Sequence, residues 1–222
     1  MGLDVQRQGD VVIATCRDGE NRLNPDTVAA LDSLANDIEH MDGACSLILM
    51  GEGKFFSNGL DLERFAGSRD ELLTTVSMFQ RLLGRLFVLP AYTVAAVNGH
   101  AFAGGAMLAC AFDYRVMRED RGYWCLNEAD IGLSLSAEMA AAVLGRLPQA
   151  TALDAMLTAR RYSAHDALAA GIVDAIASED RLIEVAVERA AMVATNHRDV
   201  VAAHKRHAFR AVAAACGWAP ER

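Results

Sequence analysis

The sequence predicts an α/β fold in which a mainly parallel sheet is covered by helices. Two short segments, 46–50 and 93–97, are almost continuously apolar, as expected of buried strands, and 113–117 is a further predicted strand. Between them lie a helical stretch over roughly 70–88 and, at 98–112, a turn that runs into a helix. Buried strands that alternate with helices are typical of parallel sheets whose two faces are both covered.

The first 40 residues predict a hairpin followed by a helix. Two strand-like runs meet at Gly9 and Asp10, a pair that suits a tight turn. Asn24 can cap the helix that follows, and Pro25 suits its first position because no N–H is needed there. Apolar residues then recur at helical spacing from 28 to 38.

From about residue 137 onward the chain is mostly helical, with one interruption at 171–177. Ser163 is a predicted N-cap, and Gly171 is a predicted helix stop. Ser136 is likewise placed to cap a helix whose first turn contains Glu138, where the helix dipole favours a negative charge.

Composition argues against several classes of function. The formal net charge of -8 disfavours binding to the phosphate backbone of nucleic acids. Five cysteines without a CxxC pair indicate reduced thiols rather than a disulfide framework. No apolar run reaches the roughly 18–20 residues of a transmembrane helix, and the N-terminus does not resemble a signal peptide. We therefore expect a cytoplasmic protein that binds neither nucleic acid nor membrane.

Several familiar motifs fail because their spacing is wrong. The segment GEGK lacks the earlier glycine and the following Ser or Thr of a P-loop, and no GxSxG nucleophile elbow occurs. The dinucleotide fingerprint fails because Phe56 occupies the place of its third glycine. His204 and His207 lie beside Lys205 and Arg206, which favours a solvated basic face over a metal site. The sequence therefore predicts no bound metal.

Two loops share one design, in which a buried strand leads through a turn of small residues into a helix. The first, FFSNGLDL, follows 46–50, and the second, NGHAFAGGAML, follows 93–97. Backbone N–H groups exposed in such turns can bind negative charge, and two that converge would form an oxyanion hole. The glycines could equally serve only to allow tight turns, and spacing alone does not separate these interpretations.

One carboxylate is distinctive in the stretch WCLNEADIGL, residues 124–133. Glu128 has many apolar neighbours in sequence, and an unpaired buried charge is costly. Glu128 is a candidate catalytic base, because apolar surroundings raise the pKa of a carboxyl group towards the range of a general base. It could also cap the turn that follows Asn127, or point to solvent.

Together, the segments GEGKFFSNGLDL, AAVNGHAFAGGAMLACAFDYRVM and LNEADIGL resemble the crotonase superfamily, the enoyl-CoA hydratase/isomerase family. The resemblance runs from about residue 3 to about residue 195, and the monofunctional Δ3-Δ2-enoyl-CoA isomerases match it best. It implies a spiral fold of stacked ββα units over 1–195, and a C-terminal helical region, 196–222, that is shorter than usual and assembles trimers. It also implies an acyl-CoA substrate, no cofactor beyond the coenzyme A moiety of that substrate, and a homotrimer or a dimer of trimers.

By position in these motifs, the resemblance places the thioester carbonyl between the backbone N–H groups of Leu60 and Gly104. Hydratases of this family use two glutamates; the first position is Met107 here, and the second is Glu128. Because a thioether cannot transfer a proton, the resemblance implies an isomerase in which Glu128 alone moves a proton from C2 to C4. Glu138 is a candidate second acid, although a structural role in its helix is the better interpretation.

The resemblance also suggests residues that bind coenzyme A. Arg22 and Lys54 lie where relatives place cations near the nucleotide, and either could instead be a solvated surface charge. Ser57, Asp61 and Leu62 belong to the first loop and complete the predicted contacts with coenzyme A. The carboxylate of Asp61 could instead accept backbone hydrogen bonds.

Three functions remain open from the sequence. The first is an enoyl-CoA isomerase, and the second is a hydratase or another lyase of the family in which Glu138 assists Glu128. The third is an acyl-CoA binding protein without catalytic activity. Three other side chains carry expectations: Asp113 should accept backbone hydrogen bonds, His100 should serve in packing, and Lys205 is a candidate cation for coenzyme A of a neighbouring subunit.

Overall fold

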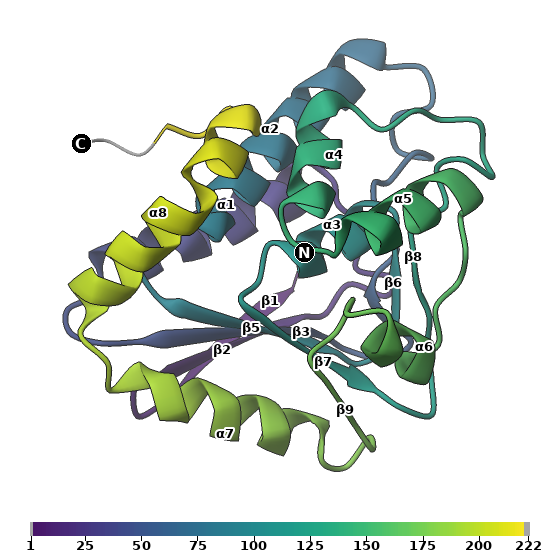
Figure 1. Ribbon diagram of the computed structural model, residues 1–222. Coiled ribbons are helices and arrows are strands. Elements are labelled where there is room, and N and C mark those ends of the chain that lie inside the picture. Colours follow the sequence, from purple (N-terminus) through teal and green to yellow (C-terminus); the bar gives the residue numbers. More distant parts are fainter. Residues whose placement is uncertain (1, 220–222) are drawn as a thin grey trace.

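The computed structural model describes residues 2–219, and two β-sheets form its centre (Figure 1). The larger sheet has six strands in the order β1 (Leu3–Gln8), β2 (Val11–Cys16), β3 (Ser46–Gly51), β5 (Tyr92–Val97), β7 (Tyr114–Arg118) and β9 (Ala175–Ala177). β1 and β2 form an antiparallel hairpin, and every later pair is parallel. The prediction of a mainly parallel sheet that begins with a hairpin is confirmed.

Helices cover both faces of this sheet. On one face, the alanines of α7 (Leu182–Ala194) pack against β3 and β5. On the other side lie four helices that pack against one another: α1 (Pro25–His40), α2 (Arg69–Phe87), α4 (Ala137–Leu144) and α8 (Arg198–Ala215) (Figure 1). Three shorter helices complete the fold: α3 (Gly104–Cys110), α5 (Gln149–Thr158) and α6 (Ala164–Ala169).

Helices begin and end at the residues whose chemistry predicts it. The side chain of Asn24 accepts a hydrogen bond from the first turn of α1, and Pro25 is the first residue of that helix. Ser136 and Ser163 cap α4 and α6 in the same way. Gly171, with φ +71°, follows the end of α6 and confirms the predicted helix stop.

The structure also contains a smaller parallel sheet, whose strands the apolar pattern of the sequence does not predict. Its strands are β4 (Phe55–Ser57), β6 (His100–Phe102) and β8 (Trp124–Cys125), in that order. Strands of two or three residues are too short to show a period of two, so these segments look like loops in sequence. Each follows one strand of the larger sheet, and the chain then enters α2 after β4 and α3 after β6. This repetition is the ββα unit that the family resemblance implies.

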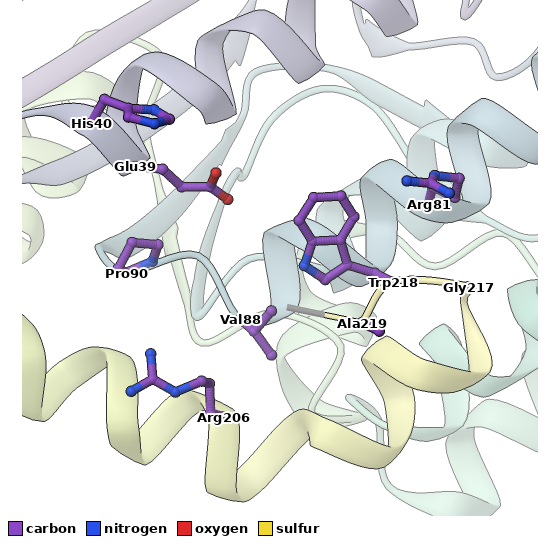
Figure 2. A pocket seen from close by; sticks show the side chains of 9 residues that line it. All are labelled: Glu39, His40, Arg81, Val88, Pro90, Arg206, Gly217, Trp218 and Ala219. Carbon is purple, nitrogen blue, oxygen red and sulfur yellow. The ribbon is translucent and has the colours of Figure 1, made fainter. Parts of the chain in front are cut away.

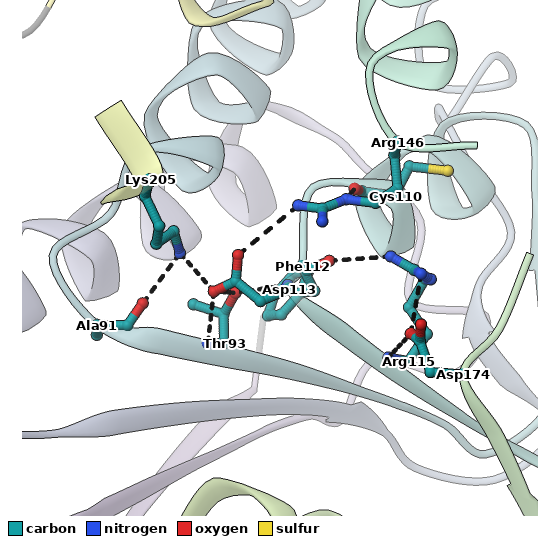
Figure 3. A network of polar contacts seen from close by, with 9 residues as sticks. All are labelled: Ala91, Thr93, Cys110, Phe112, Asp113, Arg115, Arg146, Asp174 and Lys205. Carbon is teal, nitrogen blue, oxygen red and sulfur yellow. Dashed lines mark hydrogen bonds and ion pairs between the residues drawn. The ribbon is translucent and has the colours of Figure 1, made fainter. Parts of the chain in front are cut away.

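Figure 3 shows a buried polar network that attaches α8 to the larger sheet. The ammonium group of Lys205 donates to Asp113 Oδ2 at 2.6 Å and to the carbonyl oxygen of Ala91 at 2.9 Å. The same carboxylate oxygen accepts hydrogen bonds from the backbone N–H and the hydroxyl of Thr93, each at 3.0 Å. The expectation for Asp113 is therefore confirmed. The expectation that Lys205 serves a neighbouring subunit is wrong, because Lys205 is 6% exposed and paired within its own chain.

The boundary predicted at 195–196 lies in the turn between α7 and α8. α8 then packs against α2 and α4, so the last helix covers the same layer as the helices before it. Within residues 2–219, no helix combines the length and the apolar character needed to cross a membrane.

Candidate active site

The predicted catalytic groups follow the carboxyl ends of three neighbouring strands. β4, β6 and β8 are parallel, so their carboxyl ends lie at one edge of the smaller sheet. Leu60 comes three residues after β4, Gly104 two residues after β6, and Glu128 three residues after β8. The smaller sheet therefore brings together three segments that are far apart in the sequence.

Hydrogen bonds on both sides hold the first loop in place. Ser57 is 2% exposed, and its hydroxyl donates to the carbonyl oxygen of Asn21 at 2.7 Å and accepts from the N–H of Gly59 at 3.3 Å. The N–H of Leu23 donates to the carbonyl oxygen of Gly59 at 2.7 Å, and the carbonyl oxygen of Leu23 accepts the N–H of Asp61 at 3.0 Å. The N–H of Leu60 lies between these bonds and has no acceptor within the described residues, so it is available to a ligand.

The second loop begins α3. The backbone of Ala103 precedes the helix, and its carbonyl oxygen accepts the N–H of Met107 at 3.1 Å. Gly104 is the first helical residue, so its N–H points out of the helix start and has no acceptor among residues 2–219. α3 also lies so close to β4 that a Cβ atom on Gly105 would be 2.3 Å from the carbonyl oxygen of Ser57.

The two loops touch each other through their glycines. A Cβ atom on Gly59 would lie 3.1 Å from the nitrogen of Gly104, and a Cβ atom on Gly104 would lie 3.6 Å from Gly59 Cα. Gly59 also has φ +80°, a conformation that disfavours any other residue. Glycine is thus required at position 59 for both the turn and the close approach. The same approach brings two free N–H groups, those of Leu60 and Gly104, onto adjoining segments, which is the arrangement of an oxyanion hole.

Glu128 is half-buried, and its Oε2 atom is buried without a hydrogen-bond partner in the described part of the chain. Burial raises the pKa of this carboxyl group above its ordinary value of 4.5, while its own backbone N–H lowers the pKa by a smaller amount. The nearest helix start, α4, is capped by Ser136, so Glu128 caps no helix. A carboxyl group with one buried, unpartnered oxygen and a raised pKa is suited to act as a general base.

A second catalytic carboxylate would be expected at position 107 or at Glu138, and neither has the surroundings of Glu128. Met107 is 1% exposed and belongs to the main hydrophobic core. Glu138 lies in the first turn of α4, where its own backbone N–H, and then Ser136, lower the pKa of its carboxyl group. A carboxylate stabilised in its ionised form at a helix start fits the structural interpretation of Glu138.

The two predicted cations near coenzyme A differ in their surroundings. Arg22 pairs with Glu20 at 2.7 Å, with Asp61 at 3.2 Å and with Glu63 at 3.4 Å, so carboxylates already neutralise its charge. Lys54 is exposed, and its Nζ atom lies 5.4 Å from the ring centre of Phe55. It forms no ion pair within residues 2–219. Lys54 is therefore the better placed of the two to bind a phosphate group.

The remaining predicted residues also have clear positions. Leu62 is 42% exposed beside the first loop. His100 packs against the rings of Phe55, at 5.3 Å between centroids, and Phe102, at 4.9 Å, which confirms its role in packing. Sequence reasoning missed Asn127, the residue before Glu128, because nothing in the sequence distinguishes it from a turn residue. Its Oδ1 atom is buried and has no hydrogen-bond partner among residues 2–219.

A separate cavity of about 580 Å³ lies between α1, α2 and the end of α8 (Figure 2). Its walls are formed by Glu39, His40, Arg81, Val88, Pro90, Arg206, Gly217, Trp218 and Ala219. None of the predicted catalytic or coenzyme A binding residues lines it. Among residues 2–219, no group of three or more His, Cys, Asp or Glu side chains is placed to hold a metal ion.

Comparisons with known proteins agree with this geometry. A family model described as enoyl-CoA hydratase/isomerase matches residues 8–216. Enoyl-CoA delta isomerase 2, peroxisomal, from Arabidopsis thaliana is 37% identical over 194 residues, which are 82% of this chain and 81% of the relative. Enoyl-CoA delta isomerase 1, peroxisomal, from the same plant is 39% identical over 176 residues, which are 77% and 73% of the two chains.

Solved structures agree as well. An apo enoyl-CoA isomerase of Mycobacterium tuberculosis has a TM-score of 0.89 and 26% identity, and the match covers 97% of this chain and 94% of that chain. The resemblance seen in the sequence and the spiral ββα fold that it implies are confirmed. The chain therefore belongs to the enoyl-CoA hydratase/isomerase family, the crotonase superfamily.

Proposed function

We propose that the protein is an enoyl-CoA isomerase, which moves the double bond of a 3-enoyl-CoA into conjugation with the thioester. The observation that carries this proposal is the buried Oε2 atom of Glu128, which has no hydrogen-bond partner among residues 2–219 and lies on the same sheet edge as two backbone N–H groups without acceptors there. The family's other glutamate position is occupied by Met107, which lies in the core and cannot transfer a proton. Several relatives named as enoyl-CoA delta isomerases support the same reaction.

The proposed mechanism needs one base and two hydrogen-bond donors. The thioester carbonyl oxygen accepts hydrogen bonds from the N–H groups of Leu60 and Gly104. Glu128 removes a proton from C2, the electron pair of the C–H bond moves towards the carbonyl oxygen, and a dienolate forms. Protonated Glu128 then returns the proton to C4, which leaves the double bond between C2 and C3. Because the donors are fixed before charge develops, the loss of one of them raises the barrier by ~3–4 kcal/mol.

The substrate supplies the only coenzyme that this mechanism uses, the coenzyme A moiety. The exposed Lys54 is the proposed cation for one of its phosphate groups. The family resemblance supports a homotrimer or a dimer of trimers, which sedimentation equilibrium would measure. The cytoplasmic location stays a prediction, because two of the Arabidopsis relatives are named peroxisomal.

The direct test is an absorbance assay with 3-enoyl-CoA substrates, because a conjugated enoyl thioester absorbs more strongly in the near ultraviolet. We expect absorbance to rise with the wild-type protein, and water addition to crotonyl-CoA to be far slower. Dominant hydration of crotonyl-CoA would instead indicate a hydratase. Tight binding of acyl-CoA without turnover of either substrate would indicate a binding protein.

The pH dependence of the reaction should report Glu128. Only the ionised carboxylate can remove the C2 proton, and burial raises its pKa above 4.5. We therefore expect kcat/KM on a 3-enoyl-CoA to fall as the pH decreases through a value above 4.5, the ordinary pKa of a glutamate. A profile that stays flat down to pH 4.5 would show that the base is another group or that Glu128 is solvated.

A further inference from the structure

Ala103, which directly precedes Gly104, has a backbone conformation that is rare for an L-residue. Its φ is +48° and its ψ is -121°. The described residues contain two other non-glycine residues with positive φ, Asn21 and Ala159. Asn tolerates such angles because its short side chain bonds locally, but Ala has no such compensation. The backbone at Ala103 is therefore strained, and strain of this kind persists only where the surroundings enforce it.

The backbone N–H and the carbonyl oxygen of Ala103 both form hydrogen bonds with neighbouring elements. Its N–H donates to the carbonyl oxygen of Cys125 in β8 at 2.9 Å. Its carbonyl oxygen accepts the N–H of Met107 in α3 at 3.1 Å. Because β8 and α3 both belong to the packed interior, these two bonds over-determine the dihedral angles of Ala103. The direction of the next N–H along the chain, that of Gly104, depends directly on these angles.

The methyl group of Ala103 lies against the other donor loop. A Cβ atom on Gly59 would be 2.9 Å from the Cβ atom of Ala103, which is closer than real Cβ atoms approach one another. The methyl group therefore occupies the space beside Gly59 Cα. It is thus part of the contact between the loop that carries the Leu60 N–H and its own loop, which carries the Gly104 N–H.

We propose that Ala103 is a positioning residue for the reaction: its methyl group and its enforced dihedral angles set the spacing and direction of the two N–H groups that bind the thioester oxygen. The proposal rests on the isomerase function proposed above. It assigns Ala103 no contact with the reacting atoms, since its effect passes through Gly59 and Gly104.

The test is the variant Ala103→Gly, assayed with a 3-enoyl-CoA. Glycine accepts the same dihedral angles without strain and keeps both backbone hydrogen bonds, so the variant removes only the methyl group that lies against Gly59. A misplacement of about 1 Å in a catalytic group costs about 100-fold, so we expect kcat to fall by about 10- to 100-fold. KM should change by less than about twofold, because donors that act on developing charge affect kcat rather than uniform binding. The acid limb of the pH profile should not move, because the environment of Glu128 is unchanged.

Two further variants exclude a merely structural effect. Ala159→Gly makes the same substitution at another positive φ, +50°, at the end of α5. The carbonyl oxygen of Ala159 accepts the thiol of Cys125 at 3.2 Å, and within residues 2–219 no hydrogen bond joins Ala159 to either donor loop. We expect this variant to leave kcat unchanged. Ala103→Ser keeps the Cβ atom against Gly59 and should retain kcat to within about threefold of wild type, because the spacer is preserved. Thermal unfolding of all three variants shows whether each is folded.

The outcomes separate this inference from the proposed function. If the wild-type protein isomerises 3-enoyl-CoA and folded Ala103→Gly keeps its kcat within twofold, or changes only KM, the role of Ala103 is refuted and the isomerase proposal stands. If Ala159→Gly lowers kcat as much as Ala103→Gly, the effect is general destabilisation and the role is again refuted. If the wild-type protein turns over no 3-enoyl-CoA, both proposals fail together.

Discussion

Replacement of Glu128 by Gln should lower kcat on 3-enoyl-CoA by about 10²- to 10⁴-fold, the usual contribution of a general acid–base group. The amide of Gln has nearly the shape of the carboxyl group but cannot take the proton from C2 or return it at C4. Because the Leu60 and Gly104 N–H groups are untouched, the affinity for a saturated acyl-CoA should stay within a few fold of wild type. Single-turnover kinetics and calorimetric titration of the ligand measure these two quantities separately.

Glu128→Gln should also make the folded state slightly more stable than that of the wild-type protein at neutral pH. Burial raises the pKa of Glu128 in the folded state above its unfolded value. Such a group contributes stability below the unfolded pKa, and this contribution is lost as the pH rises through the folded pKa. At pH 7 the ionised, unpaired carboxylate therefore costs free energy, and the neutral amide removes that cost.

Glu138→Gln is the matched control for this experiment. Its carboxylate has a lowered pKa at the start of α4, so we expect kcat to stay within about twofold of wild type, and at most a small loss of helix stabilisation. Equal losses of activity in Glu128→Gln and Glu138→Gln would favour the two-carboxylate chemistry of a hydratase. Unchanged turnover in Glu128→Gln would remove the proposed mechanism altogether.

Lys205→Met should produce the largest loss of stability among the variants considered. The substitution keeps most of the apolar stem but leaves the carboxylate of Asp113, whose side chain is 10% exposed, without its closest cation. The guanidinium group of Arg146 lies 3.7 Å from the other oxygen, too far to replace a 2.6 Å contact. Removal of one partner of a buried pair costs about 3–5 kcal/mol, which lowers the midpoint of thermal unfolding by roughly 10 °C.

The control for Lys205 is its exposed neighbour on the same helix. Arg206→Met removes a cation and adds the same side chain, but Arg206 forms no ion pair within residues 2–219, so stability should change by less than about 0.5 kcal/mol. Scanning calorimetry compares the two variants directly. Equal midpoints for Lys205→Met and Arg206→Met would show that the buried pair does not hold α8 on the sheet.

Local chemistry was enough to predict most of the larger elements. The side chains of Asn24, Ser136 and Ser163 satisfy N–H groups within three residues, so their effect is complete in the sequence itself. The apolar runs within β3 and β5 predict burial for a similar reason, since most of their residues are apolar. Glu128 was found because its carboxylate and its apolar neighbours are adjacent along the chain.

Contacts between distant segments could not be predicted in this way. The short strands β4, β6 and β8 exist only because they pair with one another, and none is long enough to show its own periodicity. The same limit explains Lys205, which looked like a surface cation until α8 placed it against Asp113, 92 residues away. It also explains Arg22, whose partner Asp61 lies 39 residues further along the chain.

The sequence by itself thus determined the family, the order of the main helices and strands, and the presence of one well-placed carboxylate, because each depends on neighbouring residues. Only the tertiary structure decided three features: the Gly59 and Gly104 loops touch, the Leu60 and Gly104 N–H groups have no acceptor among residues 2–219, and Ala103, with its positive φ, lies against Gly59. The physical reason is that hydrogen bonding and close packing across distant segments determine which backbone groups are satisfied and which remain available to a substrate.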